Sequence, residues 1–379
     1  MKFQRFELRH VKLELTRPFE TSFGRFTDRH LVIIKVFSDI GTCFSEAPSL
    51  HVPFYNYETT QSTLHVLKDF IIPALLKQKQ EINDIEDLHH SMDFVRGHNI
   101  AKSSIDTAFY HLMSKSQDMP LAEYLGGNRK EVEVGISLGI EDNIELLLEQ
   151  TKLALNKGYK RIKIKIKPGW DIEPIRQIRK QFGDIPIMAD ANSAYTLDSV
   201  DLFQKLDAFN LMMIEQPLGY DDIYEHSLLQ SQIKTPICLD ESIETVADAN
   251  LAVKIKACKV INIKLSRVGG IYPAIKIHDI CEEHNIPVWS GGMVESAIGK
   301  ADCTALSTLP NFKLPGDISP SDRFFNKDIV SSGLVLERGC VLVPTKTGLG
   351  VDIDEKRLED LTVGSPVVLE KYDPLLERW

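Results

Sequence analysis

The segment RIKIKIK, residues 161–167, alternates isoleucine with basic side chains and decides how the middle of the chain folds. In an extended strand successive side chains point to opposite faces, so the isoleucines share one face and the basic residues share the other. As an isolated strand, this pattern is typical of a solvated sheet edge. In a parallel barrel, however, the isoleucines would meet the surrounding helices, and Lys163 and Lys165 would point inward.

Polar residues recur every 25 residues or so after that segment. Lys165 is followed by Asp190, Glu215 and Asp240, and Lys264 continues the series. Each of these residues closes a short apolar run typical of a buried parallel strand, and stretches with helical pattern lie between the runs. One strand and one helix in roughly 25 residues form a βα unit, and several units in series can close into a barrel. The five side chains would then converge at the C-terminal mouth of that barrel.

Composition excludes several classes of protein. The 379 residues include 44 basic and 54 acidic ones, a formal charge of -10, which gives no reason to expect nucleic acid or an anionic membrane as partner. No apolar run approaches the roughly 18 to 20 residues of a membrane span, and the N-terminus lacks the apolar core of a signal peptide. Six scattered cysteines without zinc-type spacing predict free thiols in a reducing cytoplasm.

The pattern of hydrophobic residues divides the chain into three parts. Residues 1–125 predict an α+β capping domain, with strands at 3–15 and 30–38 joined by a loop and followed by helices. Residues 126–320 carry the βα repeats and predict the catalytic barrel. Residues 321–379 lose that repeat, and we expect them to leave the barrel and return to the capping domain.

The three carboxylates at successive strand ends are candidate metal ligands. A single acidic residue at a strand end can simply cap the following helix, but the equal spacing of Asp190, Glu215 and Asp240 weakens that alternative. Three hard oxygen ligands with no Cys or His nearby favour Mg²⁺ or Mn²⁺ over Zn²⁺. Glu241 points to the other side of its strand, and we expect it to play a supporting role.

The paired lysines suggest acid–base chemistry. Two partly desolvated ammonium groups about 7 Å apart each lower the pKa of the other, and this would apply to Lys163 and Lys165. An ordinary lysine, with a pKa near 10.4, is a poor base at neutral pH because it is almost wholly protonated. Lowering that pKa toward roughly 7 or 8 would make Lys165 useful as a general base.

Six motifs carry a resemblance to a known family: KIKIKPGWD (163–171), ADAN (189–192), IEQP (214–217), LDES (239–242), NIKLSRVGG (262–270) and SGGMVESAIG (290–299). Together they resemble the muconate-lactonizing subgroup of the enolase superfamily, over essentially the whole chain. Within it, SGGMVESAIG followed by LPGDISPSDRFF (314–325) is similar to the o-succinylbenzoate synthase and N-succinylamino acid racemase family. The resemblance implies an α/β fold, a modified TIM (β/α)7β-type barrel with an α+β capping domain formed by the N-terminal region and the C-terminal tail. It also implies a homo-oligomer.

The resemblance further implies a mechanism. Mg²⁺, with Mn²⁺ as an alternative, would be held by the three carboxylates, bind a small-molecule carboxylate substrate and stabilise the enediolate formed when the α-proton leaves. Lys165 would abstract that proton and then assist departure of a hydroxyl group from the same face, giving 2-succinylbenzoate for menaquinone biosynthesis. Lys264, across the barrel, would act as a stabilising cation, and Lys163 would help to keep Lys165 neutral.

Racemization of N-succinylamino acids is the main alternative, and both activities can coexist in one site. In that reaction both lysines exchange protons, and the charge of Arg267 would tune Lys264. A surface arginine in the loop after the strand is the other interpretation of Arg267. More distant alternatives are a dipeptide epimerase, a cycloisomerase, or a degenerate barrel without catalytic activity.

Candidate substrate contacts lie at strand tips, in a glycine turn and in a loop of the capping domain: Ser137, Asn192, Gly292, Met293, Phe19 and Thr21. The glycines would allow close approach of the backbone. The loop 19–25 resembles the family's mobile lid, and an ordinary connecting loop is the alternative. Closure of a lid would exclude water from the reaction.

Overall fold

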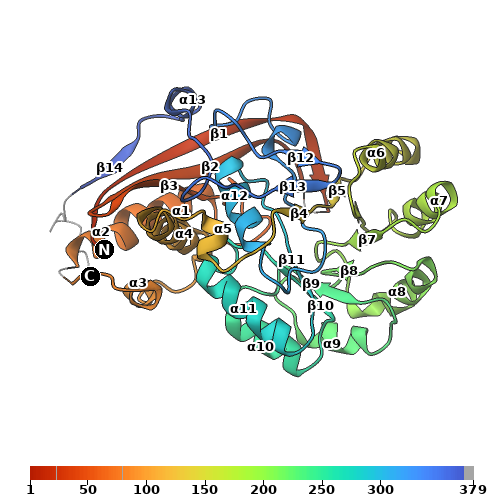
Figure 1. The fold of residues 1–379 in the computed structure, drawn as a ribbon. Coiled ribbons are helices and arrows are strands. Elements are labelled where there is room, and N and C mark those ends of the chain that lie inside the picture. The colour runs from red at the N-terminus through yellow and green to blue at the C-terminus, as the bar shows by residue number, and fades with distance from the viewer. Residues whose placement is uncertain (23, 79, 371–379) are drawn as a thin grey trace.

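The computed structural model describes residues 1–22, 24–78 and 80–370. At its centre is a parallel sheet of seven strands in sequential order: β5 (Ile136–Leu138), β6 (Ile162–Lys165), β7 (Ile187–Asp190), β8 (Ile214–Glu215), β9 (Ile237–Leu239), β10 (Val260–Ile263) and β11 (Val288–Ser290). The helices after these strands are α6 (Ile144–Asn156), α7 (Ile172–Phe182), α8 (Val200–Leu206), α9 (Tyr224–Gln230), α10 (Val246–Lys254), α11 (Ile271–Glu283) and α12 (Ala297–Leu306). Helices α6 to α11 form an arc around the curled sheet (Figure 1). This arrangement confirms the predicted barrel.

Strand β6 shows how the alternating pattern folds. Ile162, Ile164 and Ile166 are buried in the main apolar core, which also contains residues of α6 and α7. Lys163 and Lys165 are buried as well, and their ammonium groups contact carboxylates of neighbouring strands. The interpretation of this segment as a solvated sheet edge is therefore wrong, and the predicted inward orientation of the two lysines is confirmed.

An irregular segment, residues 312–317, lies between the first and last strands of the sheet. Phe312 forms a parallel bridge with Val288 of β11, and Gly316 forms one with Val134, just before β5. The Asp317 amide also donates to the Ser290 carbonyl at 2.8 Å. These backbone contacts connect the two edges and bring Asp317 to the barrel interior.

The capping domain combines an antiparallel sheet with helices. Its sheet has the order β14 (Val367–Leu369), β1 (Phe3–Thr21), β2 (Gly24–Ser38) and β3 (Gly41–Ala47). Its helices are α1 (Thr60–Val66), α2 (Ile72–Lys77), α3 (Ile85–Met92), α4 (Asn99–Ser116) and α5 (Leu121–Tyr124), with a π-helical turn, Leu67–Ile71, joining α1 to α2. Helix α4 packs against β3 on one side and the barrel helix α11 on the other, and thereby joins the two domains.

The hairpin of β1 and β2 is longer than the sequence predicted. Strands expected to end at residue 15 and to begin at residue 30 instead continue to Thr21 and from Gly24, with an irregularity between Glu14 and Phe19. Cross-strand pairs explain the extension: Phe19 faces Phe26, and Glu20 faces Arg25, whose charges lie 3.8 Å apart. Most of the predicted loop 19–25 is thus a hairpin tip. Residue 23 lies outside the described residues.

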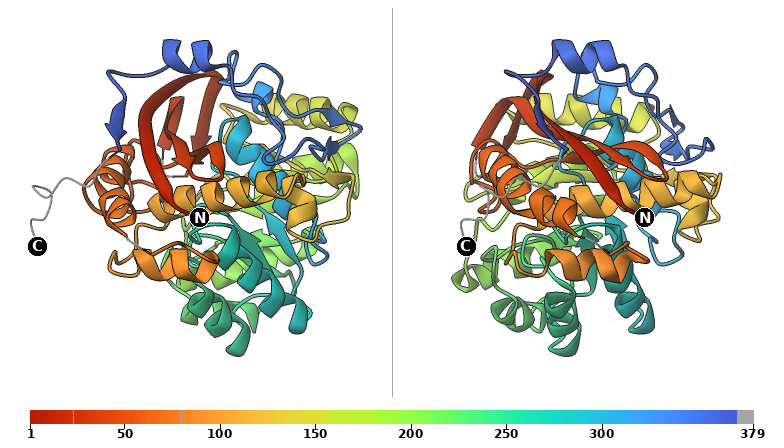
Figure 2. Two further views of the ribbon diagram at one scale, coloured as in Figure 1. Left: turned by 60° about the vertical axis from the view of Figure 1, so that its left-hand side comes forward. Right: turned by 90° about the vertical axis from the view of Figure 1, so that its left-hand side faces the viewer.

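The C-terminal segment contacts both domains. Strand β14 pairs with β1, and Glu355 of α13 (Glu355–Asp360) accepts a hydrogen bond from Lys35 of β2 at 2.8 Å. Strands β12 (Leu336–Glu337) and β13 (Cys340–Leu342) form a small sheet with β4 (Glu131–Glu133) at the start of the barrel. Figure 2 shows the blue C-terminal segments beside the red hairpin. The tail therefore packs on the cap and also on the barrel.

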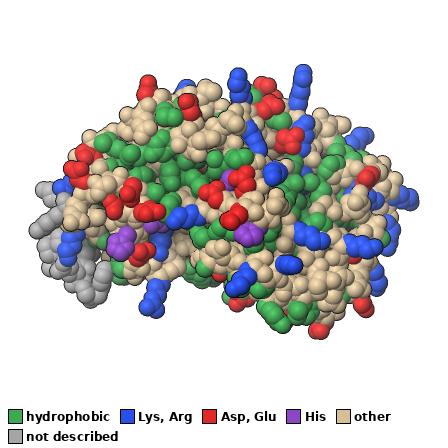
Figure 3. Space-filling view, turned by 60° about the horizontal axis from the view of Figure 1, so that its bottom comes forward, with side chains coloured by type: hydrophobic (Ala, Val, Ile, Leu, Met, Phe, Trp, Pro, Cys, Tyr) green, Lys and Arg blue, Asp and Glu red, His purple; other side chains and the backbone are tan. Residues whose placement is uncertain are grey.

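The surface charges and the cysteines agree with what the composition predicted. On the face drawn in Figure 3, acidic, basic and hydrophobic side chains are intermixed. All six cysteines are buried free thiols, as predicted. Within the described ranges, none of the helices combines the length and apolar character needed to cross a bilayer.

Candidate active site

The regular spacing of polar residues places them at one level of the sheet. Lys165 pairs in register with Asp190, and Asp190 pairs with Glu215 on the next strand. Glu215 in turn faces Cys238, two residues before Asp240. Lys264 directly follows β10. The C-terminal ends of five successive strands therefore carry the five residues, and all five side chains are buried.

Lysine ammonium groups lie among the carboxylates. Lys165 Nζ is 2.6 Å from Asp190 Oδ2 and donates to Asn192 Oδ1 at 2.5 Å. Lys163 Nζ is 3.2 Å from the same Asp190 oxygen and 3.0 Å from Glu215 Oε2. Positive and negative groups thus alternate across β6, β7 and β8, which gives each buried charge at least one partner of opposite sign.

These ion pairs shift the pKa values of Lys163 and Asp190. Burial alone would lower the pKa of Lys163, but the charges of Asp317 and Glu215 hold it well above its ordinary value. The predicted lowering of the Lys163 pKa is therefore wrong, because the negative charges of Asp317, Glu215 and Asp190, all within 3.2 Å of its ammonium group, outweigh the effect of burial. Burial opposes ionisation of Asp190, yet Lys165 and Lys163 keep its pKa below the usual range.

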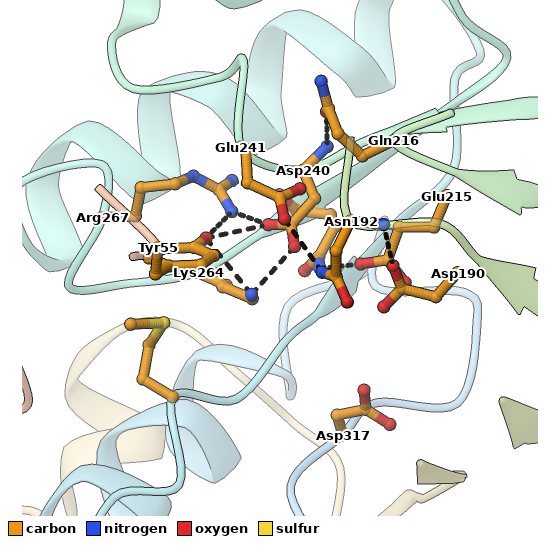
Figure 4. A network of polar contacts seen from close by, with 12 residues as sticks. Tyr55, Asp190, Asn192, Glu215, Gln216, Asp240, Glu241, Lys264, Arg267 and Asp317 are labelled. Carbon is orange, nitrogen blue, oxygen red and sulfur yellow. Dashed lines mark hydrogen bonds and ion pairs between the residues drawn. The ribbon is translucent and has the colours of Figure 1, made fainter. Parts of the chain in front are cut away.

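Lys264 belongs to a second network, drawn in Figure 4. Its Nζ lies 2.8 Å from Asp240 Oδ2 and donates to the Tyr55 hydroxyl at 3.2 Å, with the tyrosine ring centroid 4.4 Å away. Arg267 Nη1 contacts Asp240 Oδ1 and donates to the same hydroxyl at 3.2 Å. Burial lowers the pKa of Lys264, but Asp240 more than offsets this and raises it above its ordinary value.

Arg267 is one of the most deeply buried side chains, with 1% of its surface exposed. It donates to the backbone oxygens of Ile243 at 2.8 Å and Asn262 at 2.6 Å, besides its contact with Asp240. The interpretation of Arg267 as a surface arginine is therefore wrong. Its guanidinium shares one carboxylate with Lys264 and so bears directly on the charge of that lysine.

The three carboxylates fit a divalent cation by charge and by donor type. Burial and the neighbouring charge of Asp190 raise the pKa of Glu215 well above its ordinary value, which marks a concentration of negative charge in a place with little water. Oxygen ligands at such a site suit a hard cation such as Mg²⁺. Asp190, Glu215 and Asp240 are thus residues that could hold a metal.

A cavity opens where the barrel mouth meets the capping domain. Its lining combines both lysines with side chains of the two domains: Leu15, Phe19, Thr21, Phe26, Arg29, Leu50, Tyr55, Lys165, Asn192, Lys264, Gly292, Met293 and Val294. Five of the six predicted substrate contacts are in this set. Ser137 is not: it is buried and pairs in register with Lys163 on β6.

Comparisons with known proteins decide the family. Residues 146–357 match the model of the enolase C-terminal domain-like family, and residues 5–126 match that of the mandelate racemase / muconate lactonizing enzyme N-terminal domain. The chain belongs to the enolase superfamily. This membership agrees with both the barrel and the capping domain, because the two matched models cover one domain each.

Individual members of the superfamily resemble this chain over nearly its whole length. An o-succinylbenzoate synthase from Geobacillus kaustophilus is 42% identical over 356 residues, 94% of each chain. An N-succinylamino acid racemase from Amycolatopsis sp is 42% identical over 363 residues, 96% of this chain and 98% of the other. The crystal structure of an enolase superfamily member from Listeria innocua Clip11262 superposes with a TM-score of 0.93 at 37% identity, covering 98% and 99% of the two chains.

Several residues of this enolase superfamily site escaped prediction. Tyr55 comes from the capping domain and reaches Asp240 and Lys264 (Figure 4). Asp317 lies 2.6 Å from Lys163. Asn262 donates to Glu215 Oε1 at 2.8 Å. The motif LPGDIS contains Asp317 and gave a signal that it lay near the barrel, whereas nothing in the sequence around Tyr55 indicated its partners.

Glu241 contacts the candidate site through Asn192. Its Oε1 accepts a hydrogen bond from Asn192 Nδ2 at 2.9 Å, while Asn192 Oδ1 accepts from Lys165. Burial and the charge of Asp240 raise the pKa of Glu241 to about 7. The Asn192 amide therefore connects the Lys165 side of the site to the strand end that carries Asp240.

Proposed function

We propose that this chain is an o-succinylbenzoate synthase, which removes an α-proton and then water from a cyclohexadiene carboxylate to give 2-succinylbenzoate. The observation that carries the proposal is the position of Lys165 and Lys264 on one cavity, from β6 and the end of β10, with three strands and three buried carboxylates between them. The synthase at 42% identity over 94% of the chain supports the choice of substrate.

Lys165 is the proposed base. In its neutral form its amine takes the α-proton, and the resulting ammonium group then gives a proton to the departing hydroxyl group, which leaves as water. One lysine serves both steps because proton and hydroxyl leave from the same face of the ring. Asn192, which accepts from Lys165 at 2.5 Å, would hold the amine in position between the two steps.

The remaining charges stabilise the reacting carboxylate. A divalent cation, Mg²⁺ or Mn²⁺, held by Asp190, Glu215 and Asp240 would supply positive charge that makes the α-proton more acidic. Lys264 would add a fixed ammonium group on the opposite wall, since its pKa is raised. Lys163 would keep the carboxylate end of the site positively charged.

The other cavity residues would hold the substrate. Phe19, Thr21, Gly292 and Met293 line the cavity around the two lysines, and we propose that they contact the part of the substrate away from its carboxylate. Ser137, beside Lys163, would act on the substrate only through that lysine. A cytoplasmic location and a symmetric homo-oligomer are further proposals that rest on the sequence.

Racemization of N-succinylamino acids is the second candidate, and one contact favours it. That reaction needs Lys264 to give and take protons, and Arg267 competes with Lys264 for the carboxylate of Asp240. The guanidinium contacts Oδ1 of this carboxylate while Lys264 contacts Oδ2, and its positive charge weakens the hold of Asp240 on the lysine proton. The racemase at 42% identity supports the same candidate.

A paired assay tests both candidates. Purified protein with Mg²⁺ is given the cyclohexadiene carboxylate or an N-succinylamino acid, and kcat/KM is compared for dehydration and racemization. Efficient dehydration is the expected result, and dominant racemization would make the racemase the main function. Turnover of neither substrate would contradict the assignment, and an epimerase or cycloisomerase screen would follow.

A further inference from the structure

Three potential metal ligands meet on the capping domain, outside the cavity. Asp28 and His30 lie on β2, and His51 lies in the loop that follows β3. One ligand atom from each lies within 4.8 Å of the others, and His30 Nε2 is 3.5 Å from Asp28 Oδ1. Zn²⁺ bound to nitrogen and oxygen at about 2.0 to 2.2 Å in a tetrahedral site places its ligands roughly 3.3 to 3.5 Å apart. The distance between His30 and Asp28 matches this spacing, and a ligand atom of His51 lies within 4.8 Å of both.

Hydrogen bonding aims one imidazole at this point. His30 Nδ1 lies 2.7 Å from His10 Nε2 on the adjacent strand β1. When Nδ1–H donates to His10, the lone pair of His30 Nε2 faces Asp28 and His51. A metal-binding histidine commonly donates its other ring N–H in this way, which fixes both its tautomer and its orientation.

The other two groups are oriented as well. Lys12 Nζ lies 3.1 Å from Asp28 Oδ2 and leaves Oδ1 directed at His30. The His51 ring packs 4.9 Å from the His30 ring and 6.3 Å, edge-on, from that of Phe26.

A second cluster of potential metal ligands lacks a histidine nitrogen that is free to bind a metal. Among the described residues, His278, Asp279 and Glu282 also bring ligand atoms within 4.8 Å. However, His278 Nε2 accepts the Asn311 amide at 2.9 Å, and its Nδ1 is 2.8 Å from Asp279. Both ring nitrogens are therefore engaged, whereas the contact with His10 leaves Nε2 of His30 available.

We propose that Asp28, His30 and His51 form a site for a borderline divalent cation such as Zn²⁺, separate from the carboxylate site in the barrel. Two imidazole nitrogens and one carboxylate oxygen, with a fourth position open to water, suit zinc better than magnesium. This inference does not depend on the proposed function.

The site would brace the cap over the cavity. His51 is adjacent to Leu50 and four residues before Tyr55, and both of these line the cavity. Asp28 and His30 belong to the hairpin that carries Phe26, also on the cavity wall. A cation on the three ligands would therefore tie the hairpin to the loop 48–58, and the two segments would move as one unit.

Equilibrium dialysis against Zn²⁺ in a large excess of Mg²⁺ tests this site, because the excess Mg²⁺ competes with zinc for the barrel carboxylates. Wild-type protein is compared with His51→Gln, Asp28→Asn and His30→Gln, and bound zinc is measured by elemental analysis. His51 is exposed, so its variant should fold normally. The control is His65→Gln, an exposed histidine of α1 paired with Asp69.

The expected result is one zinc per chain in the wild type and in the control, with affinity weakened at least about tenfold in each of the three variants. Co²⁺ bound in place of zinc should show the strong visible absorption of a tetrahedral site in the wild type and lose it in His51→Gln. Equal zinc binding by the wild type and the three variants would overturn the proposal. Loss in only one variant would also overturn it, since the site needs all three ligands.

Discussion

The barrel and the cap give the cavity two walls of different chemistry. The barrel wall carries the lysines, Lys165 and Lys264, beside buried carboxylates, whereas the cap wall is mainly apolar, with Phe19, Phe26 and Leu50. Tyr55 is the cap side chain that reaches into the charged network, through Asp240 and Lys264. Under the proposed function, the barrel wall would move protons, and the cap wall would enclose the substrate and adjust the charge of Lys264.

Replacing Lys165 removes the proposed base from the barrel wall of the cavity, and we expect this change to have the largest effect on activity. Lys165→Ala should lower kcat/KM for both dehydration and racemization by about 10² to 10⁴, the usual contribution of a general base. Lys167→Ala is the matched control, since Lys167 is partly exposed and pairs weakly with Glu20 at 3.5 Å. Steady-state kinetics with each substrate gives the comparison, and an active Lys165→Ala variant would contradict the assigned role.

Removing Arg267 separates the two reactions. Arg267→Ala should reduce racemization by about tenfold to a hundredfold while dehydration changes less, because only racemization requires Lys264 to exchange a proton. The buried guanidinium also holds two backbone oxygens, so thermal unfolding must be followed in parallel. Equal loss of both activities would show that Arg267 acts through structure alone.

The contribution of the cap is tested at Tyr55. Tyr55→Phe keeps the ring over Lys264 but removes the hydroxyl that accepts from Lys264 and Arg267. A hydrogen bond to a charged group contributes roughly 1.5 to 3 kcal/mol, so we expect racemization to fall at least about tenfold. Exposed Tyr57, in the same loop, gives the control variant Tyr57→Phe. An unchanged racemization rate in Tyr55→Phe would show that the cap encloses the cavity without adjusting Lys264.

A smaller, structural effect concerns the loop that carries Tyr55. Glu58 accepts the amides of Ile100 and Ala101 at 2.8 and 3.1 Å and anchors this loop to α4. Burial raises the pKa of Glu58 from 4.5 to about 7. The folded state therefore binds the extra proton, and the stability contributed by Glu58 falls as pH rises between these two values.

Glu58→Gln removes this titration. Relative to the wild type, the variant should gain up to about 3 kcal/mol of stability between about pH 4.5 and about pH 7. Urea unfolding at both pH values measures the change. A constant difference between variant and wild type across this range would contradict the raised pKa.

The sequence predicted the barrel wall far better than the cap wall. Asp190, Glu215 and Asp240 follow a 25-residue spacing, and parallel strands turn that spacing into proximity. Tyr55 and Asp240 are 185 residues apart and meet only because the cap folds over the barrel mouth. No local pattern encodes such a contact. The direction of the Lys163 pKa shift likewise could not be predicted from the sequence, because it depends on the contact with Asp317, which lies in an irregular segment.

Hydrogen exchange in D₂O tests the central claim, that Lys165 and Lys264 serve opposite faces of one α-carbon, most directly. Each enantiomer of an N-succinylamino acid is incubated with the wild type, Lys165→Ala and Lys264→Ala, and α-deuterium is followed by NMR. We predict that the two variants retain exchange of opposite enantiomers, because each keeps the lysine on one face. Exchange of the same enantiomer by both variants would contradict the two-wall arrangement.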